Sequence, residues 1–228
     1  MHRYLVVVAL GLFGCTSDPE IPGEQGAARI AVTALAAGAD AQGLSMSSAW
    51  IALKTLTFVP CDPNAATLGT NDFPVDLFVT PPSFFEIDSG VTEYCGVRAE
   101  LGPSRSTEPA ELAQRSARIE GLRDDGNGFE LSSTVALRLA FDSVPAGTPL
   151  NAKKLVLGVD FDAWFEGAGV NDAELTDDVA LIDADHNAES LVAFDVATSA
   201  AFALYVDSDG DGTLTGDELS PVAGATAE

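Results

Sequence analysis

Positively charged residues are scarce in this chain of 228 residues. Lysine and arginine together number 11, against 35 aspartates and glutamates, so the formal net charge is −24 at pH 7. A surface this acidic repels nucleic-acid phosphates and anionic lipid headgroups, which excludes nucleic acid as a partner and polybasic docking to a membrane. Hydrophobic residues still make up 46% of the chain, enough for a buried core in one large β domain or two small domains.

Histidine is almost absent as well. The chain has 2 histidines, and only His186 lies beyond the N-terminal segment. A zinc site or a Ser-His-Asp triad in the mature protein would have to use this one imidazole. We therefore exclude most hydrolase and metalloenzyme classes, and expect that the protein is not an enzyme.

Long hydrophobic runs are missing except at the N-terminus. Residues 4–13 are almost wholly apolar and follow a histidine and an arginine, an order typical of the n-region and h-region of a signal peptide. The run is too short to span a bilayer as a mature helix. The sequence therefore predicts an export signal over residues 1–14.

The end of this signal is similar to the bacterial lipobox, in which a signal peptidase cuts before a cysteine that then receives lipid. Residues 12–15 carry the resemblance and read Leu-Phe-Gly-Cys. It implies that Cys15 is lipidated and that residues 15–26 form a polar tether to the membrane. Because Thr16 rather than an aspartate follows the cysteine, resemblance to enterobacterial sorting implies the outer membrane, on its periplasmic side or the cell surface. An ordinary secretory signal with a coincidental cysteine is the alternative.

Cysteine is rare too, with 3 residues in the chain. With Cys15 assigned to lipid, Cys61 and Cys95 remain as an even pair in an exported protein. One disulfide is the simplest pairing in an oxidising compartment. Two separately buried thiols are the alternative.

Apolar and polar residues alternate along the middle of the chain, which predicts half-buried strands. The alternating segments are residues 30–34, 75–79, 95–101, 134–141 and 155–161. Between Trp50 and Phe58 the apolar positions change parity, which predicts a β-bulge or a strand that changes sheets. We expect a mainly β fold over residues 27–166, an antiparallel β-sandwich of immunoglobulin or transthyretin type.

The pattern changes in residues 167–220, which begin with an acidic, irregular stretch. One short strand is expected over residues 179–182, and a helix from Asn187, which is placed to cap it. Apolar residues then recur every three or four positions, and a strand over residues 202–206 is the alternative for the end of this helix. Residues 221–228 lack a periodic apolar face and are expected to be a frayed tail.

One segment contains a specific metal-binding motif. Residues 207–218 match the calcium loop of an EF-hand at every diagnostic position. The expected ligands are side-chain oxygens at loop positions 1, 3, 5 and 12, a carbonyl at position 7 and a water-bridging hydroxyl at position 9. In that order they are Asp207, Asp209, Asp211, Glu218, Thr213 and Thr215. Oxygen-only ligands and a bidentate glutamate favour Ca²⁺ over Mg²⁺ as the bound cofactor. An acidic turn that binds no ion is the alternative.

The flanks of this loop depart from the EF-hand family. Pro221 follows closely and leaves no room for an exit helix, whereas Leu214 is placed as the apolar anchor. The segment therefore resembles the entering helix and loop of a lone EF-hand, as in extracellular modules that use calcium as a structural ion.

Two other acidic groups are less specific. Asp160, Asp162 and Glu166 lie beside Trp164 and could form the carboxylate pair of a glycan hydrolase, although a solvated strand face next to an aromatic core residue is the favoured interpretation. Residues 183–187 could hold a second metal ion, but a turn and a helix cap explain them better.

The chain also resembles a family of bacterial, especially myxobacterial, lipoproteins with a β-sandwich domain of unknown function. Residues 48–54, 155–166 and 182–187 carry this resemblance, which covers residues 27–218. The resemblance implies the sandwich fold and the envelope location but no reaction.

These observations together predict a lipid-anchored cell-envelope protein, a non-enzymatic binding or structural module stabilised by calcium. Its expected partners are the membrane, through Cys15, and an envelope protein or glycan. A carboxylate-dependent glycan hydrolase and an adhesion or assembly component of an envelope complex are the alternatives.

Overall fold

The computed structural model describes residues 27–35, 40–62, 64, 67–79, 82, 84–88, 93–105, 109–143, 149–151, 155–209 and 214–228. The expected signal peptide, the expected lipidation site Cys15 and the whole of the expected tether over residues 15–26 lie outside these residues. No helix in the described ranges is both long and apolar enough to cross a membrane.

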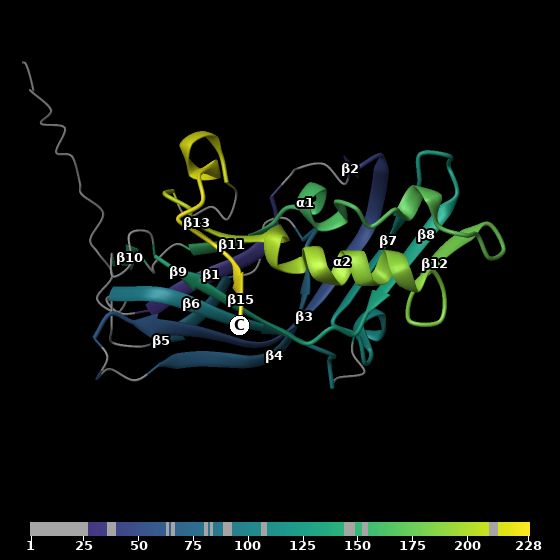
Figure 1. Ribbon diagram of the computed structural model, residues 1–228. Coiled ribbons are helices and arrows are strands. Elements are labelled where there is room, and N and C mark those ends of the chain that lie inside the picture. Colours follow the sequence, from purple (N-terminus) through teal and green to yellow (C-terminus); the bar gives the residue numbers. More distant parts are fainter. Residues whose placement is uncertain are drawn as a thin grey trace, which may run out of the picture.

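Two β-sheets dominate the described residues (Figure 1). The five-stranded sheet has the order β14-β13-β11-β1-β5, with β1 (Ala27–Ala34), β5 (Phe84–Asp88), β11 (Leu155–Val159), β13 (Phe202–Val206) and β14 (Ala223–Gly224). The ten-stranded sheet follows the path β12-β8-β7-β3-β6-β9-β15, with β10 beside β6, and with β2 and β4 beside β3. Its strands are β2 (Asp40–Ala41), β3 (Leu44–Pro60), β4 (Leu68–Asp76), β6 (Glu93–Leu101), β7 (Ala117–Leu122), β8 (Gly128–Ser133), β9 (Leu137–Asp142), β10 (Leu150–Asn151), β12 (Val179–Ile182) and β15 (Thr226–Ala227).

One hydrophobic core joins the two sheets. Ile30 and Leu157 from the smaller sheet belong to the same fully buried cluster as Ile51, Phe58 and Ile119 from the larger sheet. Among the strands that the structure describes, all pairs are antiparallel except β1 with β11 and β8 with β12. The mainly β fold and the sandwich of two sheets are therefore confirmed, with two parallel pairs added to the expected antiparallel pattern.

The long strand β3 contains the predicted bulge. Its pairing with β6 shifts register between Leu53 and Thr55, so the extra residue lies at Lys54. Ile51 and Leu53 are buried before the shift, and Leu56 and Phe58 after it. The bulge explains the change of parity. Side chains alternate between the two faces of a strand, so one inserted residue shifts the buried positions by one along the sequence.

Two helices, α1 (Phe161–Phe165) and α2 (Ala188–Ala201), pack together over the sheets (Figure 1). Trp164 of α1 is 1% exposed, and its ring stacks on Phe194 of α2 at 4.7 Å between centroids. The indole Nε1 donates a hydrogen bond of 3.1 Å to Thr198 Oγ1, which satisfies its polar atom inside the core. The described residues also form three 3₁₀ turns: η1 (Ala110–Leu112), η2 (Val170–Asp172) and η3 (Gly216–Leu219).

Two expectations about the C-terminal part are wrong. The helix ends at Ala201, and residues 202–206 form β13, the strand that was the alternative here, because pairing with β11 along all five residues satisfies their backbone groups. Beyond residue 166, β12 and β13 pair into the two sheets. The expected frayed tail instead pairs with both sheets, β14 with β13 and β15 with β9.

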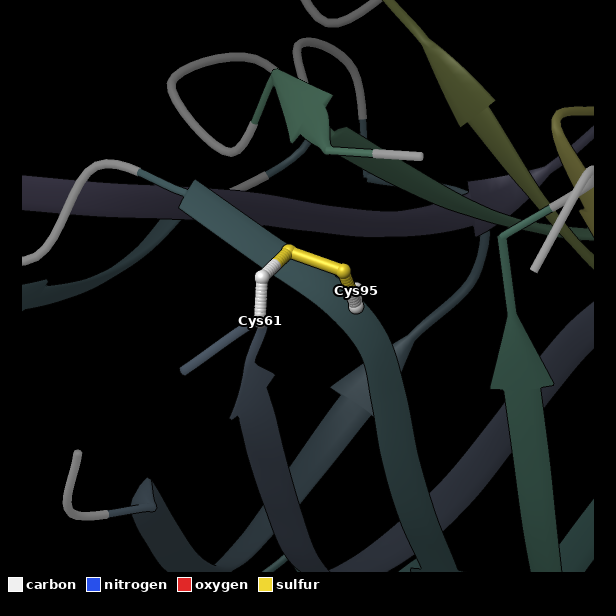
Figure 2. The surroundings of a disulfide bond; sticks show 2 residues. All are labelled: Cys61 and Cys95. Carbon is white, nitrogen blue, oxygen red and sulfur yellow. A yellow bond between two sulfur atoms is a disulfide. The ribbon is translucent and has the colours of Figure 1, made fainter. Parts of the chain in front are cut away.

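The predicted disulfide between Cys61 and Cys95 is confirmed (Figure 2). Cys61 follows the last residue of β3 and Cys95 lies near the start of β6, two strands that are already paired through Pro60 and Tyr94. The Cα atoms are 4.8 Å apart, a distance that a disulfide spans. The bond fastens one end of the larger sheet.

Candidate metal centre

The expected calcium loop begins where a strand of the smaller sheet ends. β13 is fixed by β11 on one side and β14 on the other, and Asp207, the next residue, is 0% exposed. Asp209 is exposed two residues further on, and Glu218 lies in the turn η3. Strand and turn therefore hold the two ends of the loop next to each other.

Three carboxylates meet at this point. Asp207, Asp209 and Glu218 each offer an oxygen, and these oxygens lie within 4.8 Å of one another. Among the described residues this is the one group of at least three aspartate, glutamate, histidine or cysteine side chains close enough to share an ion. We call these three residues the acidic triad. Its arrangement can bind a metal ion.

Glu218 is fixed across the loop by backbone donors. Its Oε1 accepts a hydrogen bond of 2.6 Å from the Ser208 backbone N–H, and its Oε2 accepts one of 3.0 Å from the Thr215 backbone N–H. The hydrogen bonds from Thr215 and Ser208 hold the pKa of this carboxyl below its ordinary value, because they stabilise the charged form. A carboxylate has further lone pairs, so the same group can also bind a cation.

The loop returns to the sheet through the predicted apolar anchor. Leu214 is half-buried and packs against a small cluster of Ala31, Val156 and Tyr205. These three residues belong to strands of the smaller sheet and form a cluster apart from the main core. The contact fixes the second half of the loop beside β13.

The other expected ligands divide into two kinds. Asp211 and Thr213 lie outside the described residues. Thr215 is described, and its hydroxyl donates to Glu218 Oε2 at 3.3 Å. Its contact is therefore to the carboxylate of the triad, whereas the sequence predicted a water-bridging role.

The entering helix of an EF-hand is absent from the described chain before this loop, which corrects the sequence-based expectation. α2 ends at Ala201, and the strand β13 occupies all five positions up to Val206. On the exit side the single turn η3 ends at Leu219, which agrees with the absence of an exit helix. The site is a strand–loop–turn arrangement.

The carboxylates near Trp164 do not form the expected strand face. Asp160 is the N-cap of α1, and its Oδ1 accepts from the backbone N–H groups of Asp162 and Ala163. Asp160, Asp162 and Glu166 are exposed, and Trp164 is buried in the core where no sugar ring can stack on it. The aromatic platform that motivated the glycan hydrolase alternative is therefore missing.

The acidic turn over residues 183–187 is a structural turn. Asp183 Oδ1 accepts from the backbone N–H groups of Asp185 and His186 and lies 3.0 Å from His186 Nδ1. Asn187 precedes α2 with a φ of 48°, and its side chain does not cap the helix. The Asn187 amide instead donates to the carbonyls of Glu174 and Leu181, which ties the acidic stretch to β12 and α2.

Two features were missed by the sequence analysis. Asp195 of α2 accepts a hydrogen bond of 2.7 Å from Ser133 of β8, and Ser133 is joined in turn to the buried Ser116. Burial raises the pKa of Asp195, more than the Ser133 hydrogen bond lowers it. The second feature is a hollow between residues 167–174 and the first turn of α2. Neither has a motif, since residues far apart in sequence create both.

The chain matches no described family of proteins and no curated protein. Among solved structures, MbnP from Methylosinus trichosporium is similar, with a TM-score of 0.47 and 11% sequence identity. The alignment covers 88% of this chain and 97% of MbnP. At this level of similarity the match has no bearing on function.

Proposed function

We propose that this chain is an exported bacterial envelope protein, anchored by lipid on Cys15, whose sandwich is a non-enzymatic binding or structural module and whose C-terminal loop is stabilised by Ca²⁺. The lipobox-like residues 12–15 and the Cys61–Cys95 disulfide support export, because disulfides persist in oxidising compartments. The outer membrane and the resemblance to myxobacterial lipoproteins belong to the same proposal.

The acidic triad is the observation that carries the calcium part. Ca²⁺ binds oxygens at about 2.3–2.6 Å, so two ligands on opposite sides of the ion are roughly 5 Å apart. The oxygens of Asp207, Asp209 and Glu218 lie within 4.8 Å of one another and fit around one such ion. All three are carboxylate oxygens, the donors that a hard cation prefers.

A cation here would act on the fold rather than on a substrate. Asp207 directly follows β13 and Glu218 precedes β14, so an ion bound by both would close the loop between two neighbouring strands. Without an ion, the negative charges of the triad repel one another and favour an open loop. Sites of this kind in extracellular modules bind calcium with dissociation constants of about 10⁻⁴ to 10⁻³ M, which suits a structural ion in a calcium-rich compartment.

A calcium titration of thermal stability tests this role. An ion that binds only the folded protein at ten times its Kd adds about 1.4 kcal/mol, or roughly 2 to 5 °C in Tm for a chain of this size. Glu218→Gln should shrink the shift, because it removes one charged ligand. Glu166→Gln, at an exposed glutamate outside the loop, is the matched control and should keep the full shift. No shift up to about 10 mM Ca²⁺, well above the range of extracellular modules, would contradict the calcium role.

The anchor is tested separately by Cys15→Ser. The unchanged protein should partition into the detergent phase after expression in a bacterium, and the variant should be soluble or retain its signal peptide. An unlipidated Cys15 in the unchanged protein, with identical fractionation of both, would contradict the anchor and leave the calcium result unaffected.

A further inference from the structure

Helix α2 presents an apolar stripe to solvent. Residues 188, 192, 196 and 200 recur every four positions and lie on its exposed side, and they are Ala188, Val192, Val196 and Ala200. Val192 is 61% exposed and Val196 is 75% exposed. No other helix or strand crosses the front of α2 in Figure 1. We call these four residues the α2 stripe.

The stripe has no role in the fold described above. α2 packs against α1 and the sheets through its opposite side, where Phe194, Thr198 and Ala201 are buried. A surface helix that is stable through one buried face ordinarily carries charged residues on the other. In a chain with a net charge of −24, an uncharged valine face is an exception that points to a contact.

An acid-lined hollow adjoins the N-terminal end of the stripe. It has a volume of about 660 Å³ and lies between residues 167–174 and the first turn of α2, with Ala188 in its wall. Asp172, Glu174 and Glu189 line it, and all three are exposed. The partial positive charge of the α2 N-terminus is about half an elementary charge, less than the charge of these carboxylates. The hollow therefore attracts cations.

One basic side chain that contacts the wall of the hollow, Arg123, already has partners. Arg123 is buried, and its guanidinium donates to the backbone carbonyls of Ala173 and Asn171 and pairs with Asp125 at 3.1 Å. It fixes residues 171–173 in place from the inside. The carboxylates on the outer side of the same segment remain exposed to solvent.

We propose that the α2 stripe and the hollow together dock a protein segment with an apolar face and a lysine or arginine beside it. Its apolar residues would cover Val192 and Val196, and its cationic side chain would enter the hollow between Asp172, Glu174 and Glu189. Charge complementarity selects this occupant: a second copy of this acidic chain and an anionic membrane surface would both be repelled. The inference rests on the proposed binding role of the sandwich, but not on calcium or the lipid anchor.

Binding of two matched peptides tests the surface. The probe is an amphipathic leucine–lysine peptide of about the length of α2, and its control has glutamate at every lysine position. We expect the lysine peptide to bind more tightly to the whole folded protein, with an affinity that falls as salt rises. Equal binding of the two peptides would overturn the proposal.

Variants locate the binding. Val192→Ser with Val196→Ser should weaken the lysine peptide by about fivefold or more, because each removes exposed apolar area from the contact. Asp172→Asn with Glu174→Gln should weaken it by about threefold or more at low salt. Asp40→Asn with Glu111→Gln removes the same charge elsewhere and should change the affinity less than twofold. If the control pair lowered the affinity for the lysine peptide as much as Asp172→Asn with Glu174→Gln does, net charge alone would attract the peptide. That result would overturn the proposal.

Two other occupants would be recognised by the same variants. If the valine pair abolished binding to neutral phosphatidylcholine vesicles, and the lysine peptide did not bind, the face would be a lipid contact. If the unchanged protein sedimented as a dimer and the valine pair as a monomer, the face would join two copies. Either result would overturn the proposal, and the calcium titration would stand in both cases.

Discussion

Two closures can be compared in this sandwich: the covalent one of the disulfide, and the ionic one that we propose for the acidic triad. Cys61 and Cys95 fasten β3 to β6 in the larger sheet, where Pro60 and Tyr94 are already paired. The acidic triad lies at the end of β13, before the short strands β14 and β15 that pair with one sheet each. The disulfide therefore closes the larger sheet by a bond that needs no cation, whereas under the proposed calcium role the closure of the C-terminal strands depends on a cation that balances the carboxylates.

The largest expected effect is the loss of the covalent closure. Cys61→Ala with Cys95→Ala removes a cross-link over a sequence separation of 34, and the chain-entropy model gives about 4 kcal/mol for such a loop. That corresponds to a fall in Tm of roughly 8 to 16 °C. Thermal melts of the oxidised protein and the double variant measure it.

Reduction of the unchanged protein is the control. Dithiothreitol should lower its Tm toward that of the double variant and leave the variant unchanged. A double variant that melts with the oxidised protein would show that β3–β6 pairing alone closes this end of the sheet.

The next prediction is that the disulfide and calcium at the acidic triad stabilise the protein independently of each other. The calcium shift of roughly 2 to 5 °C expected for the acidic triad should be the same in the Cys61→Ala/Cys95→Ala variant, because the two closures lie in different sheets and share no residue. Melts of both proteins with Ca²⁺ and with a chelator measure this. A calcium shift that disappears with the disulfide would mean that the two closures act as one.

A smaller effect follows from the ionisation of Glu218. Hydrogen bonds from Thr215 and Ser208 lower its pKa in the folded protein from the ordinary 4.5. Its stabilising contribution is therefore present above about pH 4.5 and is lost as the pH falls through the lower folded value. In calcium-free protein, the difference in Tm between the unchanged chain and Glu218→Gln should be larger at pH 7 than at a pH below the ordinary value of 4.5. A difference that is constant with pH would contradict this account.

The smallest effect has the opposite sign. Burial raises the pKa of Asp195, so its ionised form costs stability at neutral pH, and stability is gained as the pH falls through the raised value. Asp195→Asn keeps an acceptor for Ser133 and removes the charge. We expect a rise in Tm of about 1 to 2 °C at pH 7, discounted because the group is only half-buried. The rise should disappear at low pH, where both side chains are neutral.

Local patterns predicted the parts of the fold that depend on near neighbours. The parity change around Lys54 revealed the bulge, since strand period depends only on adjacent residues. Val179–Ile182 is the short strand expected there. Compartment chemistry predicted the pairing of Cys61 with Cys95. The triad was found because its loop motif fixes ligand spacing within twelve residues.

Two of the errors arise where pairing with strands distant in sequence decides the structure, and a third where a strand ends. Residues 202–206 fit a helical and a strand pattern alike, and pairing with β11 selected the strand. The last residues look featureless, yet β13 and β9 offer them unpaired backbone groups at their edges. Asp160 was placed on a strand face because nothing in the local alternation shows that β11 ends at Val159 and a helix begins.

Amide hydrogen exchange with and without Ca²⁺ separates the two closures, the proposed one of the C-terminal strands by the acidic triad and that of the larger sheet by the disulfide. We expect slower exchange on calcium addition in β13 and β14, at Leu204 and Ala223 among others, with no change in β3 and β6. The disulfide-free variant should show the reverse: faster exchange at the β3–β6 end and the same calcium response in β13 and β14. Equal protection of both sheets by calcium, or none in β13 and β14, would contradict the proposed closure by the acidic triad.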